Sequence, residues 1–153
     1  MSEAAPDLPA RLRAAGLRVT SQRLLLHATL VEIGRHATAD EVMRAAVPRL
    51  PGLSLPTVYA TLELLARLGL VQRVAAGGAV RWDPGPDPHA HFCCTVCGAL
   101  EDVPGAAQAG ALERAAARAG LTVESVDVVL HGSCAACRER TSSPGRTAAD
   151  SAG

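Results

Sequence analysis

Apolar side chains in the first fifty residues recur every three to four positions, which is typical of helices that bury one face. This spacing covers residues 7–15 and residues 20–33, and a glycine follows each segment as a stop signal. We expect Thr20 to cap the second helix through its hydroxyl group. Thr38 and Glu41 then stand three positions apart, which is the spacing of a capping box. A third helix is therefore predicted to begin there and to end before the next proline.

Residues 55–68 form the fourth predicted helix, with Ser54 as its cap and a proline in its first turn, where a missing N–H costs little. Two short apolar runs follow on either side of Gly77 and Gly78, a pattern that predicts a β-hairpin. Three helices, a helix of the recognition type and a hairpin make a winged helix-turn-helix, in which the hairpin is the wing. We therefore assign residues 1–83 to a winged-helix DNA-binding domain.

The chain changes character at residues 84–88, where three prolines in five residues indicate a stiff hinge. Beyond this hinge, short apolar runs predict an α/β domain over residues 89–138. Its predicted elements are a strand at 91–95, a strand at 99–103, a helix at about 106–119 and a strand at 121–130. Residues 139–153 are rich in Ser, Pro, Gly, Arg and Ala, and we expect this tail to be disordered. The fold class predicted for the whole chain is α/β (α+β).

Composition and charge narrow the classes of function. Hydrophobic residues make up 48% of the 153 positions, yet there is one Phe, one Trp and one Tyr, so the core is built from Leu, Val and Ala. The formal net charge is zero, but residues 1–80 carry a net charge of +3 and residues 81–153 a net charge of −3. A basic half beside an acidic half fits nucleic acid on one side and a metal cation on the other, although chance variation explains so small an imbalance equally well.

The cellular location also bears on the cysteines. The chain shows no signal-peptide pattern and no apolar run near the roughly 18 residues of a membrane span, so we expect a cytoplasmic protein. Disulfides are rare in the cytosol, where closely spaced cysteines more often bind metal.

Four of the five cysteines form two Cys-x-x-Cys pairs, Cys94 with Cys97 and Cys134 with Cys137, separated by 36 residues. Four thiolates in two such pairs make a closed tetrahedral zinc site that contributes folding energy. The alternative is a redox motif, which needs a pair at a helix N-terminus after a strand, whereas we expect both pairs to end strands. We therefore predict a structural zinc. Cys93 stays outside this set, because only Cys94 has the two-residue spacer to Cys97.

His89 and His91 flank Ala90 just upstream of the first cysteine pair. Residues two apart in an extended strand point to the same face, so the two imidazoles can share a second metal ion. A sealed four-thiolate site leaves no open position for the zinc–water catalysis of a hydrolase, and the sequence has no H-E-x-x-H motif. We therefore predict a regulator with no catalytic residues rather than an enzyme.

Five stretches, in the same order along residues 10–138, resemble the ferric uptake regulator (Fur) superfamily of metal-dependent transcription factors. They are GLRVTSQR at 16–23, HATADE at 36–41, SLPTVY at 54–59, HAHFCCTVCG at 89–98 and GSCAAC at 132–137. The resemblance implies a homodimer with an N-terminal winged helix and a C-terminal α/β dimerisation domain. It also implies repression by binding of double-stranded palindromic operator DNA when a regulatory metal bridges the two domains.

By this resemblance, the ligands of the regulatory metal fall on His36, Asp83, His89, His91 and Asp102. Imidazoles and carboxylates suit Fe(II), Mn(II) or Zn(II). A metal held by both domains fixes the angle between them and shifts the population towards a DNA-binding state. Taken without the family, His36 is a polar residue before a helix cap and Asp83 is a turn carboxylate.

Asp102 matches the peroxide-sensing (PerR) branch of the superfamily, because iron-uptake regulators usually carry Glu there. In that branch peroxide, reduced at bound Fe(II), leads to oxidation of a ligand histidine, and the matching positions are His36 and His89. Glu101 adjoins Asp102, so a shift of one residue restores the glutamate of an iron- or manganese-responsive uptake repressor, which is the alternative function. The hinge lacks the cysteine of the zinc-uptake branch, and the extra histidines of the nickel branch are missing. A thiol redox switch that uses Cys93 is a further hypothesis.

The resemblance also implies a DNA surface. It places Thr57 and Tyr59 of the predicted recognition helix against the duplex. Arg18, Gln22 and Arg23, before and within the second helix, are candidate phosphate contacts. A solvated surface charge is the competing interpretation of each arginine. Two-fold symmetry predicts half-sites about one helical turn apart.

Overall fold

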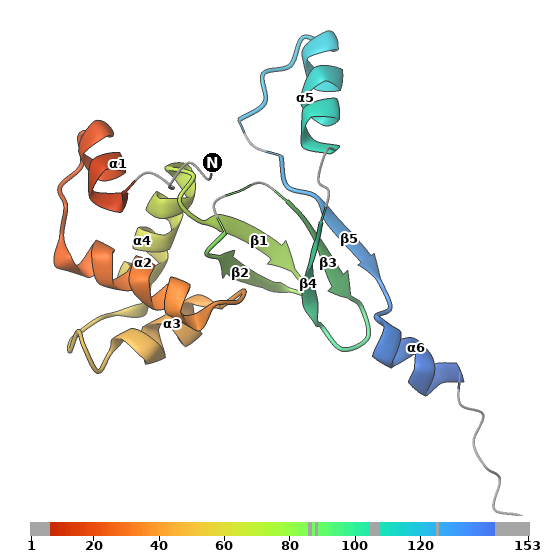
Figure 1. The fold of residues 1–153 in the computed structure, drawn as a ribbon, viewed down its shortest axis with the longest axis horizontal. Helices are drawn as coiled ribbons and strands as arrows, with labels where there is room; N and C mark the ends of the chain where they lie inside the picture. The colour runs from red at the N-terminus through yellow and green to blue at the C-terminus, as the bar shows by residue number, and fades with distance from the viewer. Residues whose placement is uncertain (1–6, 86, 88, 105–107, 125, 143–153) are drawn as a thin grey trace, which may run out of the picture.

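A computed structural model describes residues 7–85, 87, 89–104, 108–124 and 126–142. The described chain forms a helical half and a sheet half, with a hairpin between them (Figure 1). Two prolines of the predicted hinge, the first residues of the helix predicted from 106 and the predicted tail beyond 142 lie outside the described residues.

Four helices make the first half, as the sequence predicts. They are α1 (Leu8–Ala14), α2 (Ser21–Ile33), α3 (Ala39–Ala46) and α4 (Leu55–Arg67). Their apolar faces share one core, in which Leu12, Leu26, Leu62 and Trp82 are fully buried. Within the described chain, no helix is both long enough and apolar enough to cross a membrane.

Local hydrogen bonds explain where these helices begin. The Thr20 hydroxyl accepts from the backbone N–H of Arg23, and Thr38 forms the complete predicted capping box with Glu41. Ser54 occupies the N-cap position of α4, but its side chain makes no capping bond. Its hydroxyl lies 2.7 Å from the hydroxyl of Thr57 instead, so the prediction of a side-chain cap is wrong at this helix because a second hydroxyl engages the Ser54 oxygen.

The predicted hairpin is confirmed and is fastened to the helices. β1 (Gln72–Ala76) and β2 (Ala79–Asp83) pair in antiparallel fashion around two glycines with positive φ, a backbone conformation that side chains disfavour. In addition to the pairing of β1 with β2, Trp82 of β2 forms an isolated bridge with Ala37. Each backbone N–H of the bridge donates to the other residue's carbonyl, at 3.0 and 2.8 Å. The segment before α3 is thereby held against β2.

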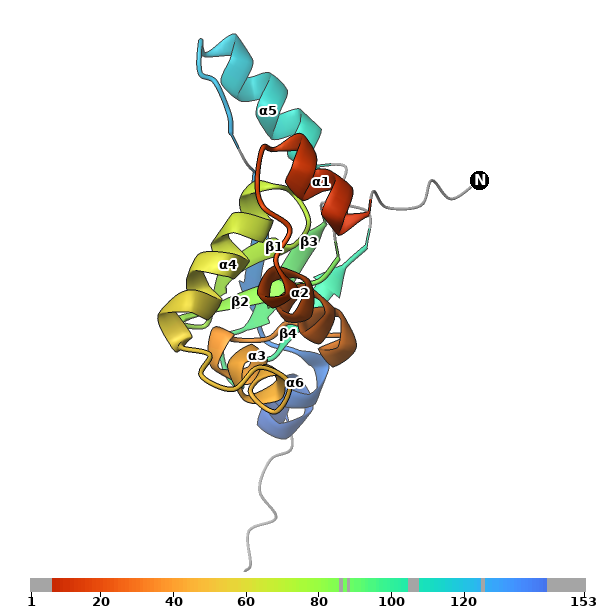
Figure 2. The same cartoon turned by 90° about the vertical axis from the view of Figure 1, so that its left-hand side faces the viewer.

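The second half is built on a three-stranded sheet with the order β4-β3-β5. β3 (Ala90–Cys94) pairs antiparallel with β4 (Leu100–Val103) and parallel with β5 (Val129–Gly132). α5 (Gln108–Arg118) lies between the two edge strands in sequence, and α6 (Ala135–Ser142) follows β5. Both views show α5 beyond one end of the sheet and α6 near the opposite end (Figures 1 and 2).

Two sequence predictions for this half need correction. The strand predicted at 121–130 is observed at Val129–Gly132, later and shorter than predicted, and its pairing with β3 runs from His91 to Cys94. The tail predicted to be disordered from residue 139 continues as α6 through residue 142. Within this helix, the Cys137 carbonyl accepts from the Thr141 hydroxyl at 2.9 Å.

A second apolar cluster joins the wing to the sheet. Val74 and Ala76 of β1 pack with Cys93 of β3, and Leu100 and Val129 lie at the margin. Cys93 is 2% exposed and behaves here as a small apolar residue.

Candidate metal centres and nucleic-acid interface

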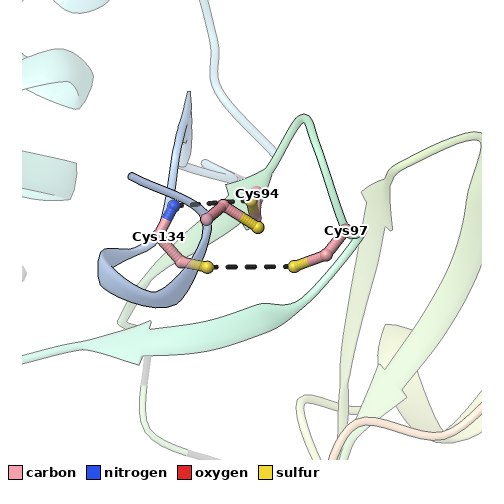
Figure 3. A group of neighbouring side chains, drawn as sticks. Cys94, Cys97 and Cys134 are labelled. Carbon is pink, nitrogen blue, oxygen red and sulfur yellow. Dashed lines mark hydrogen bonds between the residues drawn. The ribbon is translucent and has the colours of Figure 1, made fainter. Parts of the chain in front are cut away.

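The two cysteine pairs converge at the end of the sheet next to α6. The Sγ atoms of Cys94, Cys97, Cys134 and Cys137 all lie within 4.8 Å of one another. Figure 3 shows the thiols of Cys97 and Cys134 pointing toward each other, with 3.8 Å between their sulfurs. Four sulfurs at this spacing are the donor set of a closed tetrahedral zinc site, so these residues fit the predicted metal.

Hydrogen-bond donors reach two of these sulfurs, those of Cys94 and Cys137. The backbone N–H of Cys134 donates to Cys94 Sγ at 3.4 Å (Figure 3). With the backbone N–H of Cys97, it lowers the pKa of the Cys94 thiol to about 6. The Arg140 guanidinium donates to Cys137 Sγ at 2.8 Å. At Cys97 a backbone hydrogen bond with Ala99 acts to lower the pKa, but hydrogen bonds with the Cys94 and Cys137 thiols outweigh it and raise the pKa to about 11. Thiolates are the form that binds metal, so Cys94 is the sulfur that its surroundings prepare for a divalent cation.

The second pair does not end a strand, which corrects the sequence interpretation. β5 ends at Gly132 and α6 begins at Ala135, so Cys134 and Cys137 lie at the start of a helix. That is the placement expected of a redox motif. The case for a metal therefore depends on the meeting of all four sulfurs, which a two-thiol motif does not require. Cys93 is outside this group and lies in the apolar cluster between wing and sheet.

The five residues that the resemblance assigns to a regulatory metal also meet in space. His36, Asp83, His89, His91 and Asp102 each offer one atom within 4.8 Å of the others. Asp83 Oδ2 lies 2.7 Å from His89 Nε2 and 3.3 Å from His91 Nε2. His36 Nε2 lies 3.1 Å from Asp102 Oδ1 and 3.5 Å from Asp83 Oδ2. Three ring nitrogens and two carboxylates thus face one centre, a donor set suited to Fe(II) or Mn(II).

The bridge between Ala37 and Trp82 explains how residues far apart in sequence reach this centre. His36 directly precedes Ala37, and Asp83 directly follows Trp82. Because the two bridge residues are hydrogen-bonded in both directions, their neighbours His36 and Asp83 lie side by side. The helical half and the hairpin therefore contribute one side chain each, His36 and Asp83, through one local contact.

The register of β3 and β4 distinguishes Asp102 from Glu101. His91 pairs with Asp102 and Phe92 pairs with Glu101, and neighbouring strand residues point to opposite faces. Both side chains are exposed, but Asp102 belongs to the group and Glu101 does not. The rings of His89 and His91 have centroids 4.4 Å apart, as expected for side chains two positions apart.

The electrostatics of this group favour a cation. His36, Asp83 and His91 are 9%, 5% and 3% exposed. Burial lowers the pKa of His36, which leaves a neutral imidazole, and among the described residues its Nε2 has no hydrogen-bond partner. At His89, burial acts to lower the pKa, but the Asp87 carbonyl and the two carboxylates outweigh it and raise the pKa. A buried nitrogen without a partner, next to carboxylates, fits a metal ion.

Two residues around this group escaped the sequence analysis. The Gly85 N–H donates to Asp83 Oδ1 at 2.8 Å, so Oδ2 is the oxygen left for the imidazoles. A Cβ atom at Gly85 would lie 3.3 Å from Asp83 Oδ1. Gln72 Nε2 lies 3.0 Å from the Gly85 carbonyl and 2.6 Å from the Asp87 carbonyl. The sequence Asp-Pro-Gly predicts a turn and so could have identified Gly85. A single glutamine at the start of a strand gives no indication of a role at this site.

The predicted DNA contacts converge in part. Gln22, Arg23 and Thr57 line a groove of about 310 Å³ between α2 and α4. Tyr59 and Arg18 do not line it, although Tyr59 is 38% exposed on α4 and the Arg18 carbonyl accepts from the Arg23 guanidinium. Amide, guanidinium and hydroxyl groups of this kind bind phosphate oxygens.

Comparisons with known proteins identify relatives of this chain. The model of the ferric uptake regulator family matches residues 14–131. Ferric uptake regulation protein 1 of Mycolicibacterium fortuitum is 36% identical over 135 residues, which are 87% of this chain and 83% of that protein. The peroxide-responsive repressor PerR of Staphylococcus epidermidis is 35% identical over 94 residues, which are 61% of this chain and 63% of that protein. The chain thus matches less than two thirds of this second relative. A solved structure of the ferric uptake regulator from Pseudomonas aeruginosa with manganese is similar at a TM-score of 0.65 and 26% identity, over 82% of this chain and 96% of that chain.

Proposed function

The chain belongs to the ferric uptake regulator family, and we propose that it is a metal-dependent, DNA-binding transcriptional repressor that acts as a cytoplasmic homodimer. The observation that carries the proposal is the group of three histidines and two aspartates shared between the two halves of the molecule. A site that only stabilised one half would not need ligands from the other. We infer a regulator without catalytic activity.

The domain organisation follows from the same group. We propose a winged-helix DNA-binding domain at residues 1–83, a hinge at 84–88 and a dimerisation domain at 89–138. His36 and Asp83 belong to the first domain, and His89, His91 and Asp102 to the second or its edge. A metal ion that binds all five stabilises one relative placement of the domains by its differential affinity for that placement. DNA binding then depends on metal occupancy.

We propose two metals with different roles. The four cysteines hold a structural zinc, which supplies folding energy rather than chemistry. The nitrogen and oxygen group holds Fe(II) or Mn(II) as the regulatory metal, because imidazoles and carboxylates suit these ions better than thiolates do. The relative from Pseudomonas aeruginosa, whose structure is described as containing manganese, supports this choice.

Peroxide sensing is the finer proposal for the regulatory site. Fe(II) held by these five residues would supply the electron that reduces peroxide, and the rings of His36 and His89 are the ligand side chains that would be oxidised beside it. Three features support it: the similarity to peroxide-responsive repressors, the presence of Asp102 in the group, and the position of Glu101 outside it. Oxidation of the imidazole ring would weaken its bond to the metal. The metal would then dissociate, and the protein would release the DNA.

An iron- or manganese-responsive uptake repressor without redox sensing is the second candidate. It uses the same ligands, and it is favoured by the longer match to ferric uptake regulation protein 1. The two candidates differ only in what peroxide does to the loaded protein.

The partners proposed are palindromic duplex DNA and a second copy of the chain. Leu112, Leu121 and Leu130 of the sheet half are 51%, 63% and 47% exposed, so this half presents apolar surface that a second copy can cover. At the other end, α4 and the groove beside it carry four of the proposed DNA contacts, Gln22, Arg23, Thr57 and Tyr59, and the fifth, Arg18, precedes α2. Two copies of α4 related by two-fold symmetry read two half-sites about one helical turn apart.

The test uses duplexes selected from a random library by the Mn(II)-loaded protein. The dimer is loaded with Fe(II) or Mn(II), bound to the selected duplex and treated with dilute peroxide. The masses of the peptides that contain His36 and His89 are then measured by mass spectrometry. Release with iron only, with one added oxygen on either histidine, supports peroxide sensing. Retention in both cases, with unmodified histidines, leaves the uptake repressor. Cys93→Ser is the matched control, because a thiol switch would lose its response in this variant and the iron mechanism would keep it.

A further inference from the structure

Gln72 connects the wing to the segment that carries the metal group. It is the first residue of β1, and its register partner across the hairpin is Asp83, the carboxylate shared by three imidazoles. The Gln72 side chain is half-buried and reaches past the end of the hairpin. A change in the position of the wing therefore moves Gln72 and Asp83 together.

The amide group of Gln72 has two N–H donors, and two backbone carbonyls lie within reach. Nε2 is 3.0 Å from the Gly85 carbonyl and 2.6 Å from the Asp87 carbonyl. The same nitrogen lies 3.1 Å from His89 Nδ1. One side chain of the wing thus contacts three successive described positions of the segment between Asp83 and His89.

The Asp87 carbonyl also contacts His89, at 2.8 Å from Nδ1. With Nδ1–H donating to this carbonyl, Nε2 is the nitrogen that faces Asp83 and Asp102, at 2.7 and 3.1 Å. Metal-binding histidines are commonly oriented in this way by a backbone carbonyl at the second nitrogen. Gln72 holds that carbonyl in place from the wing.

We propose that Gln72 is a positioning residue of the regulatory metal site, which orients His89 through the Asp87 carbonyl and couples metal binding to the position of the wing. This inference rests on the proposed function. Gln72 does not touch the metal position itself, since its amide is used by the carbonyls. It holds the carbonyls of Gly85 and Asp87 in place before any metal binds, and preorganisation of this kind raises affinity.

The first test compares Gln72→Met with the unaltered, zinc-loaded dimer. Methionine keeps the length and the packing of the side chain but removes both donors. Binding of Mn(II) alone is titrated by electron paramagnetic resonance of the free ion. We expect the dissociation constant of Gln72→Met to rise about tenfold, the lower end of the effect of removing an outer contact to a ligand. Arg73→Met is the control, since Arg73 is the next residue on β1 and its side chain pairs with Glu63 instead.

The second readout is the visible absorption spectrum of Co(II) bound in place of Mn(II). A misoriented His89 changes the band positions or intensities of Gln72→Met, whereas a merely destabilised fold leaves the spectrum of the bound ion unchanged. Should Gln72→Met fail to fold, Gln72→Asn serves as the second variant, because it keeps the amide but draws it back by one methylene.

Unchanged Mn(II) affinity and an unchanged Co(II) spectrum in a folded Gln72 variant would overturn the inference and leave the proposed function intact. An unaltered protein that binds no Mn(II) beyond the four-cysteine site would overturn both. The two failures are therefore distinguishable in one set of titrations.

Discussion

Ala37 and Trp82 exchange two backbone hydrogen bonds, at 3.0 and 2.8 Å, although 45 positions separate them in the chain. This contact lies one residue away from both His36 and Asp83. It brings the loop before α3 to the last strand of the wing, and the two candidate ligands follow. The relative position of these ligands is therefore set by backbone geometry rather than by the metal.

Substitutions of Trp82 test how much its side chain stabilises the fold around this contact. Its ring is fully buried, and among the described residues its Nε1 has no hydrogen-bond partner. We expect Trp82→Ala to lower the free energy of unfolding by about 3–5 kcal/mol through the cavity it leaves. Trp82→Phe should lose less than half as much, because it keeps an aromatic ring and removes the unsatisfied N–H. Urea unfolding followed by circular dichroism measures both, and equal losses would contradict the role assigned to the ring.

The capping box of α3 supports a second prediction. The backbone N–H of Thr38 donates to Glu41 at 2.8 Å, and this bond lowers the pKa of the Glu41 carboxyl. Thr38→Ala should reduce the free energy of unfolding by about 1 kcal/mol. Thr57→Ala is the control, since that hydroxyl caps no helix. The contribution of the Glu41 carboxylate is present above its ordinary pKa and is lost as the pH falls below it, so the gap between Glu41→Gln and the unaltered protein should shrink in acid.

His27 gives a pH dependence that is separate from the metal group. Burial lowers its pKa in the folded state, although a backbone hydrogen bond with Leu70 opposes the shift. The unfolded chain therefore takes up a proton more readily, and stability from this group is present above the ordinary histidine pKa of about 6.5 and declines as the pH falls through it. His27→Gln should remove that part of the decline between pH 7.5 and 5.5. A parallel loss of stability in both proteins over this range would show that His27 does not contribute.

The zinc content of cysteine variants distinguishes the four proposed zinc ligands from Cys93. Cys137→Ser removes one of four converging sulfurs and should abolish the retention of one zinc per chain, together with folding of the sheet half. Cys93→Ser should keep the zinc, because Cys93 lies in the apolar cluster with Val74 and Ala76. Elemental analysis after dialysis against a chelator measures both variants. Loss of zinc from Cys93→Ser alone would reverse the assignment.

Arg23 tests the groove between α2 and α4. A phosphate contact contributes to affinity for any duplex and to its salt dependence. Arg23→Gln should therefore weaken binding to selected and random duplexes alike, and should reduce the slope of log affinity against log salt by about 1. Arg118→Gln on α5 is the control, because it removes the same charge from the sheet half. A salt slope that does not change would mark Arg23 as a solvated surface charge.

Local signals in the sequence account for most of the fold. Thr20 and Thr38 mark the starts of α2 and α3 because their hydroxyls bond to nearby amides, which depends only on residues three positions away. The length of β5 could not be predicted in this way, because it depends on pairing with β3 from an earlier part of the chain. The helix that begins within the second cysteine pair was missed for a similar reason, since the residue before its first turn, Cys134, is hydrogen-bonded to the sulfur of Cys94 from another part of the chain.

The candidate metal site also combines features that the sequence predicts with features that only the tertiary structure shows. The ligand set depends on the family resemblance, and no spacing in the chain would have joined His36 to Asp102. The bridge at Ala37 and Trp82 and the strand register bring them together. Gln72 could not be anticipated, because its role arises from where the hairpin ends relative to the following turn.

The separation of the two cysteine pairs has a kinetic consequence. The parallel pairing of β3 with β5 closes a loop of about 40 residues. A cross-link between the ends of such a loop offsets roughly 4 kcal/mol of chain entropy. A zinc ion bound first by Cys94 and Cys97 would bind Cys134 and Cys137 once that part of the chain comes near. The order of events would then run from metal capture to strand pairing, so that the supply of zinc during synthesis sets how fast this half of the molecule matures.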